Sequence, residues 1–142
     1  MTEEHQVNCE IVMVIDDNRI DLYIASRMII KNNFGNTVLQ YTSAIEALKY
    51  LQENQDNIAL LPDVIFVDIY MPCMNGFEFM AEYDSLPIAL KRHCKVFIIS
   101  SSKDDEDVAK ANRDKNIVAM QEKPITKEFL NEIKICHKSL QS

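Results

Sequence analysis

The feature that most constrains the fold of this chain is a run of four apolar residues, 64–67, that leads directly into Asp68. Consecutive β-branched and aromatic residues are typical of a strand buried on both faces of a parallel sheet. An unpaired carboxylate is costly inside such a strand, but open parallel sheets leave a ligand crevice at the carboxyl ends of their strands. We therefore treat Asp68 as the centre of a candidate active site. From this stretch alone, an aspartate that caps the next turn is the equal alternative.

Size and composition indicate one soluble domain. The chain has 142 residues, of which 47% are hydrophobic and 26% charged, as is ordinary for a globular protein. Its net charge of −7 disfavours direct nucleic-acid binding, which depends on a basic surface. Apolar stretches are shorter than the roughly 20 residues that span a bilayer, and residues 1–10 do not form a signal peptide. We expect a single cytoplasmic domain over 1–142, with a core of about 10–140 and a polar tail over 1–8.

Residue spacing argues against several other kinds of site. The four cysteines are scattered, at Cys9, Cys73, Cys94 and Cys136. Without a C-x-x-C pair we expect no zinc site and no redox dithiol, only buried or half-buried thiols. Two glycines, Gly35 and Gly76, are too few for a Gly-rich phosphate loop. The three histidines have no evident acidic partner and are expected at the surface: His5, His93 and His137.

Apolar patterning predicts strands that alternate with helices. Strands are expected at residues 10–15, 37–41, 64–68, 95–100 and 117–120. Helices are expected over about 18–33, after residue 43, after residue 76, over 103–115 and after residue 126, with a loop at 54–62 and a turn near residue 87. Regular alternation implies a parallel sheet with helices on both faces, which is an α/β fold.

Capping residues and apolar faces refine the helices. Asn18, Ser43 and Thr126 are expected to cap the first, second and last helices. The predicted apolar face of the first helix is formed by Ile20, Tyr23, Ile24, Met28 and Ile29. The helix at 103–115 has few apolar residues and is expected to be loosely held, with the acidic run 104–107 in solvent at its N-terminus.

Polar or charged residues end or follow four of the five predicted strands: Asp16, Asp17, Asp68, Ser100 and Lys123. Carboxylates that meet at one edge repel one another unless a cation lies among them, and Mg²⁺ suits such oxygen ligands. Carboxylates, an ammonium group and a hydroxyl are the groups needed to accept a phosphoryl group. Each residue alone is typical of a cap or a solvated turn; their joint occurrence indicates a site.

These residues lie in four ordered motifs, and with them the chain resembles the receiver domain of two-component response regulators over about residues 11–140. The motifs are Val-Ile-Asp16-Asp17-Asn, Asp68-Ile-Tyr-Met-Pro72-Cys-Met-Asn-Gly76, Ile-Ile-Ser100-Ser101 and Glu-Lys123-Pro124. The resemblance implies a flavodoxin-like, doubly wound five-stranded parallel sheet of order 2-1-3-4-5. It makes Asp68 the acceptor of a phosphoryl group from a histidine kinase or a phosphotransfer protein.

The resemblance also implies a role for each residue around Asp68. Asp17 would bind Mg²⁺ directly, Asp16 through water, and the Tyr70 backbone carbonyl would complete the protein ligands. Ser100 would hold a phosphoryl oxygen, and Lys123 would pair with the acyl phosphate. The peptide bond between Lys123 and the next residue, a proline, would be cis.

Two departures from the family pattern bear on the output of the switch. Met120 stands where many receivers carry an aromatic residue on the fifth strand, and a methionine fills a pocket without a discrete ring rotation. We therefore expect output through Ser101, Ser102 and the helix at 103–115. Tyr70 and Ser102 flank the phosphoryl position and offer no acid to orient water, which favours slow self-dephosphorylation.

Other functions remain as alternatives at this stage. One is a receiver separated from a DNA-binding response regulator, and another is a Mg²⁺-dependent phosphatase with an aspartate nucleophile. The phosphatase chemistry calls for a second acid two residues after the nucleophile, where this chain has Tyr70. We expect a switch that is not a classical enzyme, a monomer or weak dimer that binds another protein or passes the phosphoryl group onward, without nucleic acid or membrane.

Overall fold

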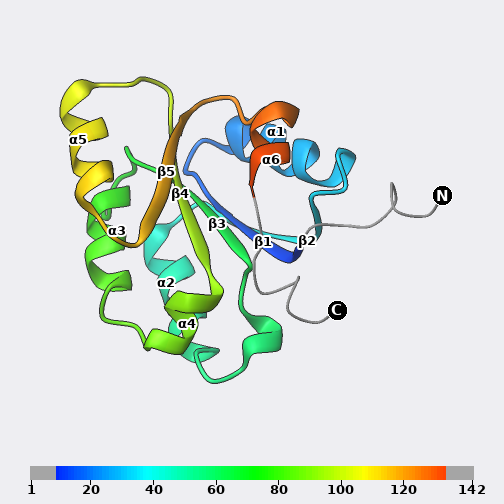
Figure 1. Ribbon diagram of the computed structural model, residues 1–142, viewed down its shortest axis with the longest axis vertical. Coiled ribbons are helices and arrows are strands. Elements are labelled where there is room, and N and C mark those ends of the chain that lie inside the picture. The colour runs from blue at the N-terminus through cyan, green and yellow to red at the C-terminus, as the bar shows by residue number, and fades with distance from the viewer. Residues whose placement is uncertain (1–8, 134–142) are drawn as a thin grey trace.

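The fold, taken from a computed structural model that describes residues 9–133, is built on a five-stranded parallel sheet (Figure 1). Its strands are β1 (Cys9–Ile15), β2 (Gly35–Tyr41), β3 (Val64–Asp68), β4 (Lys95–Ser100) and β5 (Ile117–Glu122). They are ordered β2-β1-β3-β4-β5, and every neighbouring pair is parallel. This order confirms the doubly wound α/β fold expected from the sequence.

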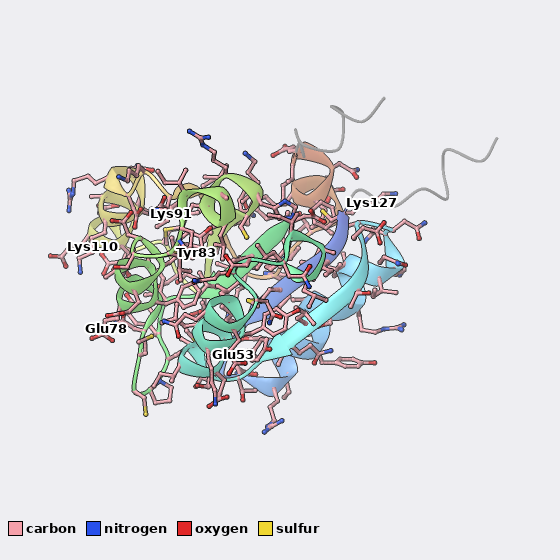
Figure 2. All side chains as sticks on the ribbon, turned by 90° about the horizontal axis from the view of Figure 1, so that it is seen from below. Glu53, Glu78, Tyr83, Lys91, Lys110 and Lys127 are labelled. Carbon is pink, nitrogen blue, oxygen red and sulfur yellow. The ribbon has the colours of Figure 1, made fainter. Side chains whose placement is uncertain are left out.

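Helices cover both faces of the sheet (Figure 1). They are α1 (Arg19–Lys31), α2 (Ala44–Glu53), α3 (Gly76–Tyr83), α4 (Ile88–His93), α5 (Asp105–Arg113) and α6 (Lys127–Glu132). Buried residues of α1 and α6 pack on one face, and those of α2, α3, α4 and α5 on the other. Tyr83 of α3 points inward, whereas Glu78 and Lys110 lie on the outside of this second layer (Figure 2).

β3 occupies the centre of the sheet, and all five of its residues are buried. Its Phe66 ring lies 5.7 Å from the ring of Phe97 on β4, which in turn lies 5.6 Å from that of Phe129 on α6. Burying such a side chain stabilises a fold by about 1.5–3 kcal/mol. Asp68 is therefore held at the end of the most tightly enclosed strand of the domain.

The predicted apolar face of α1 is wrong at three positions. The side chains of Ile20, Tyr23 and Ile24 are exposed, at 70%, 62% and 40%. The helix instead buries Leu22, Ala25, Ser26 and Ile29. Small residues let the helix approach the sheet closely, and the Ser26 hydroxyl is satisfied because it donates to the Leu22 carbonyl at 2.8 Å. The larger apolar residues consequently form a strip on the solvent side, which we call the α1 strip (Ile20, Tyr23 and Ile24).

The predicted helix caps are confirmed, but two short elements were missed. Asn18 accepts hydrogen bonds from two α1 backbone N–H groups, Ser43 accepts one from Glu46, and Thr126 accepts one from Phe129. The expected turn near residue 87 is the helix α4, and the expected loop at 54–62 contains a 3-10 turn at Ile58–Leu60. Both elements are too short for their sequences to show a helical repeat of apolar residues, and Leu90 is the only residue that α4 buries.

The prediction that His93 has no acidic partner is wrong. Its Nε2 lies 3.1 Å from Oδ1 of Asp63, a buried residue just before β3. Asp63 Oδ2 also accepts backbone hydrogen bonds from Glu10 at 2.7 Å and Ile11 at 3.3 Å. A single buried carboxylate thus joins β1, β3 and α4 at the edge opposite the candidate site. His5 and His137 lie outside the described residues.

The cysteines are buried or exposed according to their position in the fold. Cys9 and Cys94 are buried, and burial raises the pKa of the Cys94 thiol to about 12. Cys73 is exposed in the loop after β3, contrary to the expectation of a buried or half-buried thiol. Cys136 lies outside the described residues. Within residues 9–133, none of the helices has the length and apolar character needed to cross a membrane.

Candidate functional site

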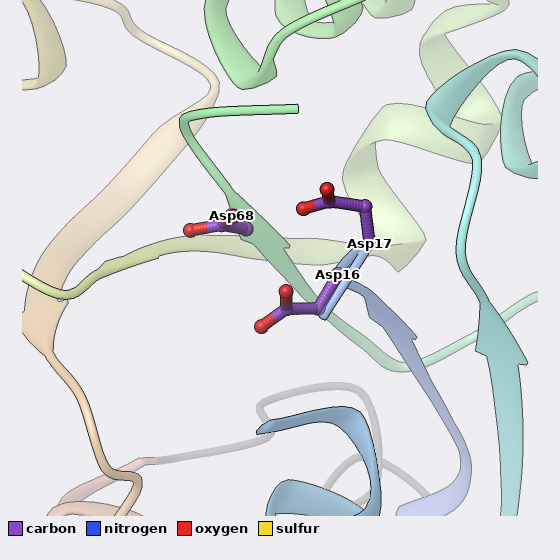
Figure 3. Close-up of side chains that lie close together, drawn as sticks. All are labelled: Asp16, Asp17 and Asp68. Carbon is purple, nitrogen blue, oxygen red and sulfur yellow. The ribbon is translucent and has the colours of Figure 1, made fainter. Parts of the chain in front are cut away.

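The predicted site residues lie together at the carboxyl edge of the sheet. Figure 3 shows Asp16 and Asp17, which follow β1, beside Asp68 at the end of β3. One carboxylate oxygen from each of the three residues lies within 4.8 Å of the other two. Asp16 and Asp68 are buried, whereas Asp17 is exposed. Two of the three carboxylates are thus shielded from water, and the third is open to it.

The turn between β1 and α1 fixes Asp16. Its backbone N–H donates to the Tyr41 carbonyl at 2.9 Å, which extends the pairing of β1 with β2. Its Oδ1 accepts the backbone N–H of Asn18 at 3.0 Å, while Asn18 itself caps α1. The carboxylate is therefore oriented by the same residues that start the helix.

The loop after β3 closes over Asp68 through Gly76. The Gly76 N–H donates to the Ile69 carbonyl at 2.7 Å. A Cβ atom at position 76 would lie 2.5 Å from the Asp68 carbonyl oxygen and 3.0 Å from Ile69 Cα. Because both are backbone atoms, at the end of β3 and in the loop after it, only glycine fits without moving them.

Lys123 pairs with three carboxylates. Its Nζ lies 2.7 Å from Asp16 Oδ2, 3.0 Å from Asp21 Oδ2 and 3.3 Å from Asp68 Oδ1. Its backbone N–H donates to the Ser100 carbonyl at 2.7 Å, and the bond from Lys123 to Pro124 is cis, as the resemblance implied.

Burial and charge act in opposite directions on the two central groups. Burial alone would lower the pKa of Lys123, but its hydrogen bonds to Asp16 and Asp21 and the Asp68 charge raise it above the usual value. Burial, followed by repulsion from Asp16, raises the pKa of Asp68 to about 6 in spite of Lys123. Burial and repulsion therefore disfavour the ionised form of Asp68, and a cation bound beside it would stabilise that form.

The remaining predicted site and output residues lie on β4 and β5 and in the loops that follow β3 and β4. The Ser100 hydroxyl is buried and accepts the Ser102 backbone N–H at 3.3 Å, whereas Ser101 and Ser102 are exposed. Met120 is half-buried against the core on the α5 side of the sheet. Tyr70 has a half-exposed ring whose hydroxyl donates to the Asp107 carboxylate of α5.

Two contacts in this region were missed from the sequence. Asp107 is buried and accepts the Tyr70 hydroxyl, so the prediction that the whole acidic run 104–107 lies in solvent is wrong. Asp21 lies in the first turn of α1, and its carboxylate accepts a hydrogen bond from Lys123. The two residues are 102 positions apart in the sequence, and no local pattern signals the pair.

The residues present fit a hard divalent cation. Three carboxylates that share one edge supply the oxygen ligands that Mg²⁺ prefers, and Asp17 leaves one side open for water. A cavity of about 200 Å³ adjoins this edge, between Lys123 and α1. Asp16, Asp21, Ile24, Lys123 and Pro124 are among the residues that line it.

The family model of the response regulator receiver domain matches residues 12–134, and the chain belongs to this family. A putative two-component response regulator of Arabidopsis thaliana is 44% identical over 68 residues, 47% of this chain and 11% of that protein. A sensor histidine kinase of Helicobacter pylori is 40% identical over 72 residues, 51% of this chain and 8% of that protein. The matched part is thus about a tenth of the length of these curated relatives.

Solved structures of the same family share the fold over most of their length. A two-component response regulator from Cytophaga hutchinsonii has a TM-score of 0.83 and 27% identity, covering 95% of this chain and 99% of that chain. A receiver protein from Dyadobacter fermentans has a TM-score of 0.78 and 30% identity, covering 87% and 93%. Receiver domains are switches rather than classical enzymes; they typically use Mg²⁺ at an acidic pocket and act with histidine kinases or phosphotransfer proteins.

Proposed function

We propose that this chain accepts a phosphoryl group on Asp68 and so switches its binding to another protein. The observation that carries the proposal is the surroundings of the Asp68 carboxylate. It is buried, lies within 4.8 Å of ligand oxygens of Asp16 and Asp17, and is 3.3 Å from Lys123 Nζ. A carboxylate held in this way is both nucleophile and anchor for a phosphoryl group.

The transfer follows from the groups at the site. An Asp68 carboxylate oxygen attacks the phosphorus of a phosphohistidine on the donor protein, the P–N bond breaks, and its electron pair stays on the imidazole nitrogen. That nitrogen then takes up a proton. The Lys123 ammonium offsets the charge that gathers on the phosphoryl oxygens, and the Ser100 hydroxyl donates to one of them.

Asp17, Asp16 through water, Asp68 and the Tyr70 backbone carbonyl would hold Mg²⁺ at this edge. When bound, the ion supplies positive charge that offsets the repulsion between the carboxylates and the phosphoryl oxygens.

A docking surface for the donor lies beside the reacting group. The α1 strip is exposed, and Ile24 lines the same cavity as Lys123. Exposed apolar side chains gathered next to a polar site are typical of protein interfaces. We therefore place the donor protein on α1, with its phosphohistidine directed at Asp68.

Removal of the metal is expected to stop the reaction. With acetyl phosphate as donor, chelation of Mg²⁺ by EDTA should slow phosphoryl incorporation at least about 100-fold, the usual effect of losing a principal source of positive charge. Intact-mass spectrometry over time measures the rate. In the amide NMR spectrum of the wild type, Mg²⁺ should shift the signals of residues 16, 17 and 68. The same titration should show weaker Mg²⁺ binding to Asp17→Asn. Equal rates with and without EDTA would contradict the metal site.

Output is proposed to pass through α5. Of the residues in this helix, only Asp107 and Ala111 are buried. Asp107 accepts the Tyr70 hydroxyl, and Lys110 Nζ lies 5.4 Å from the centre of the Phe77 ring. A phosphoryl group on Asp68 that draws in the Ser100 hydroxyl would disturb its bond from Ser102, in the loop that leads into α5. The helix can respond because little else fastens it.

Tyr70→Phe tests this route. The substitution removes the hydroxyl and leaves a buried carboxylate without that donor, so amide exchange in α5 should rise by about tenfold in the unphosphorylated protein. Beryllofluoride should raise the exchange rate of the same amides in the wild type and have a smaller additional effect in the variant. Tyr23→Phe, on the exposed α1 strip, is the matched control and should exchange as the wild type does. Unchanged amide exchange over residues 101–116 in both experiments would contradict the proposal that output passes through α5.

A further inference from the structure

We propose that Asp21 is a positioning residue that holds the Lys123 ammonium on the α1 side of Asp68. When Asp68 carries a phosphoryl group, Lys123 binds that group only after it has given up its contact with Asp21. The inference rests on the proposed function of Asp68, but it assigns a role to a residue outside the four motifs that relate this chain to its family.

Carboxylates surround the Lys123 ammonium in the unphosphorylated state. An ammonium group has three N–H donors and no acceptor. Three carboxylates surround Nζ, those of Asp16 at 2.7 Å, Asp21 at 3.0 Å and Asp68 at 3.3 Å. The Lys123 side chain is only 14% exposed, so water contributes little to its solvation. A close contact with a phosphoryl oxygen therefore requires Lys123 to move away from one of these carboxylates.

Asp21 is the carboxylate that can release Lys123 most easily. Asp16 is 1% exposed and is fixed by the Asn18 N–H, and its Oδ2 has no hydrogen-bond partner among the described residues, so its buried charge depends on the ion pair with Lys123. The Asp21 side chain is 36% exposed and lines the cavity beside α1. It also lies in the first turn of α1, where the positive end of the helix dipole stabilises a carboxylate. Releasing the lysine therefore leaves Asp21 solvated.

The exchange opposes phosphorylation. The bond from Lys123 to Asp21 stabilises the unphosphorylated state and is lost when the phosphoryl group arrives. Asp21→Asn keeps the size of the side chain and a neutral acceptor, but it removes the charge that competes for Lys123. Charge-assisted hydrogen bonds are roughly twice as strong as neutral ones, and partial exposure reduces the difference. Asp21→Asn should therefore favour the phosphoryl-bound state.

The test is the affinity for beryllofluoride, a phosphoryl mimic, in the presence of Mg²⁺, measured in two backgrounds. With Lys123 present, Asp21→Asn should bind beryllofluoride about three- to tenfold more tightly than the wild type. In a Lys123→Met background, the same substitution should leave the affinity unchanged, because Asp21 acts through Lys123. Asp21→Glu retains the charge and should resemble the wild type, as should Asp56→Asn, which removes an exposed acid from the loop after α2.

Two results would overturn the proposal. If Asp21→Asn raised the affinity for beryllofluoride equally with Lys123 and with Lys123→Met, Asp21 would act only through the overall negative charge of the site. If Asp21→Asn did not raise this affinity in the protein that retains Lys123, no exchange would occur.

A second measurement stands apart from the phosphoryl chemistry. Nitrogen-15 NMR of the Lys123 ammonium in the metal-free protein should show its protons exchanging with water several-fold faster in Asp21→Asn than in the wild type. Unchanged exchange would overturn the positioning role by itself. If the wild type failed to bind beryllofluoride, the proposed function would fail, while the ammonium signal would still decide whether Asp21 holds Lys123.

Discussion

Asp63→Ala is expected to lower the free energy of unfolding by about 2–4 kcal/mol, because two backbone N–H groups lose a charged acceptor. The Asp63 carboxylate accepts the backbone N–H groups of Glu10 and Ile11 and lies 3.1 Å from His93 Nε2. Its removal takes the acceptor from two N–H groups at the start of β1 and the partner from His93 in α4. Because the whole domain is stable by only about 5–15 kcal/mol, this is a large part of the total.

Urea denaturation followed by circular dichroism measures the effect. Asp63→Asn keeps one acceptor oxygen and should lose less than Asp63→Ala. Asp56→Ala removes an exposed acid and should change the free energy by less than about 0.5 kcal/mol. A loss below about 1 kcal/mol for Asp63→Ala would mean that the carboxylate is not the junction between β1, β3 and α4.

Gly76→Ala is expected to cost about 2–4 kcal/mol of stability and to suppress phosphorylation of Asp68 as well. The added Cβ would lie 2.5 Å from the Asp68 carbonyl oxygen and 3.0 Å from Ile69 Cα, so the backbone at Asp68 must move. Catalytic geometry tolerates little displacement, since a shift of about 1 Å can slow a reaction 100-fold. Denaturation and the rate of acetyl phosphate uptake are the two measurements.

Gly35→Ala is the matched control for this prediction. At that position the added Cβ meets side-chain methyl groups, with Val12 Cγ2 at 2.6 Å and Ile29 Cγ2 at 3.2 Å. These atoms belong to the α1 face of the core. Gly35→Ala should therefore destabilise the protein while folded molecules still take up the phosphoryl group. Normal uptake by Gly76→Ala would contradict the close packing of the loop on Asp68.

The sheet and the acidic cluster were predictable because both follow from short, local patterns. The run that ends at Asp68 is buried on both faces, and such a strand occupies the centre of a parallel sheet. Because parallel strands place their carboxyl ends at one edge, the residues after β1, β3, β4 and β5 had to meet there. Neither step depends on knowing how a particular side chain packs.

The contacts that the sequence did not reveal depend on tertiary packing. The predicted apolar face of α1 was based on its large apolar residues. The helix instead buries small residues such as Ala25 and Ser26, which allow a closer approach to the sheet. Asp21 and Lys123 lie on different elements 102 residues apart, and His93 meets Asp63 only because α4 packs at the start of β3. Such pairs leave no periodic pattern in the sequence, and each member alone resembles an ordinary surface charge.

The most direct test of phosphoryl acceptance is intact-mass spectrometry of the wild type and Asp68→Asn after incubation with acetyl phosphate and Mg²⁺. We predict that the wild type gains the mass of one phosphoryl group and that Asp68→Asn, folded under the same conditions, gains none. An unmodified wild type, or an equal gain in Asp68→Asn, would contradict the assignment of Asp68 as the phosphoacceptor.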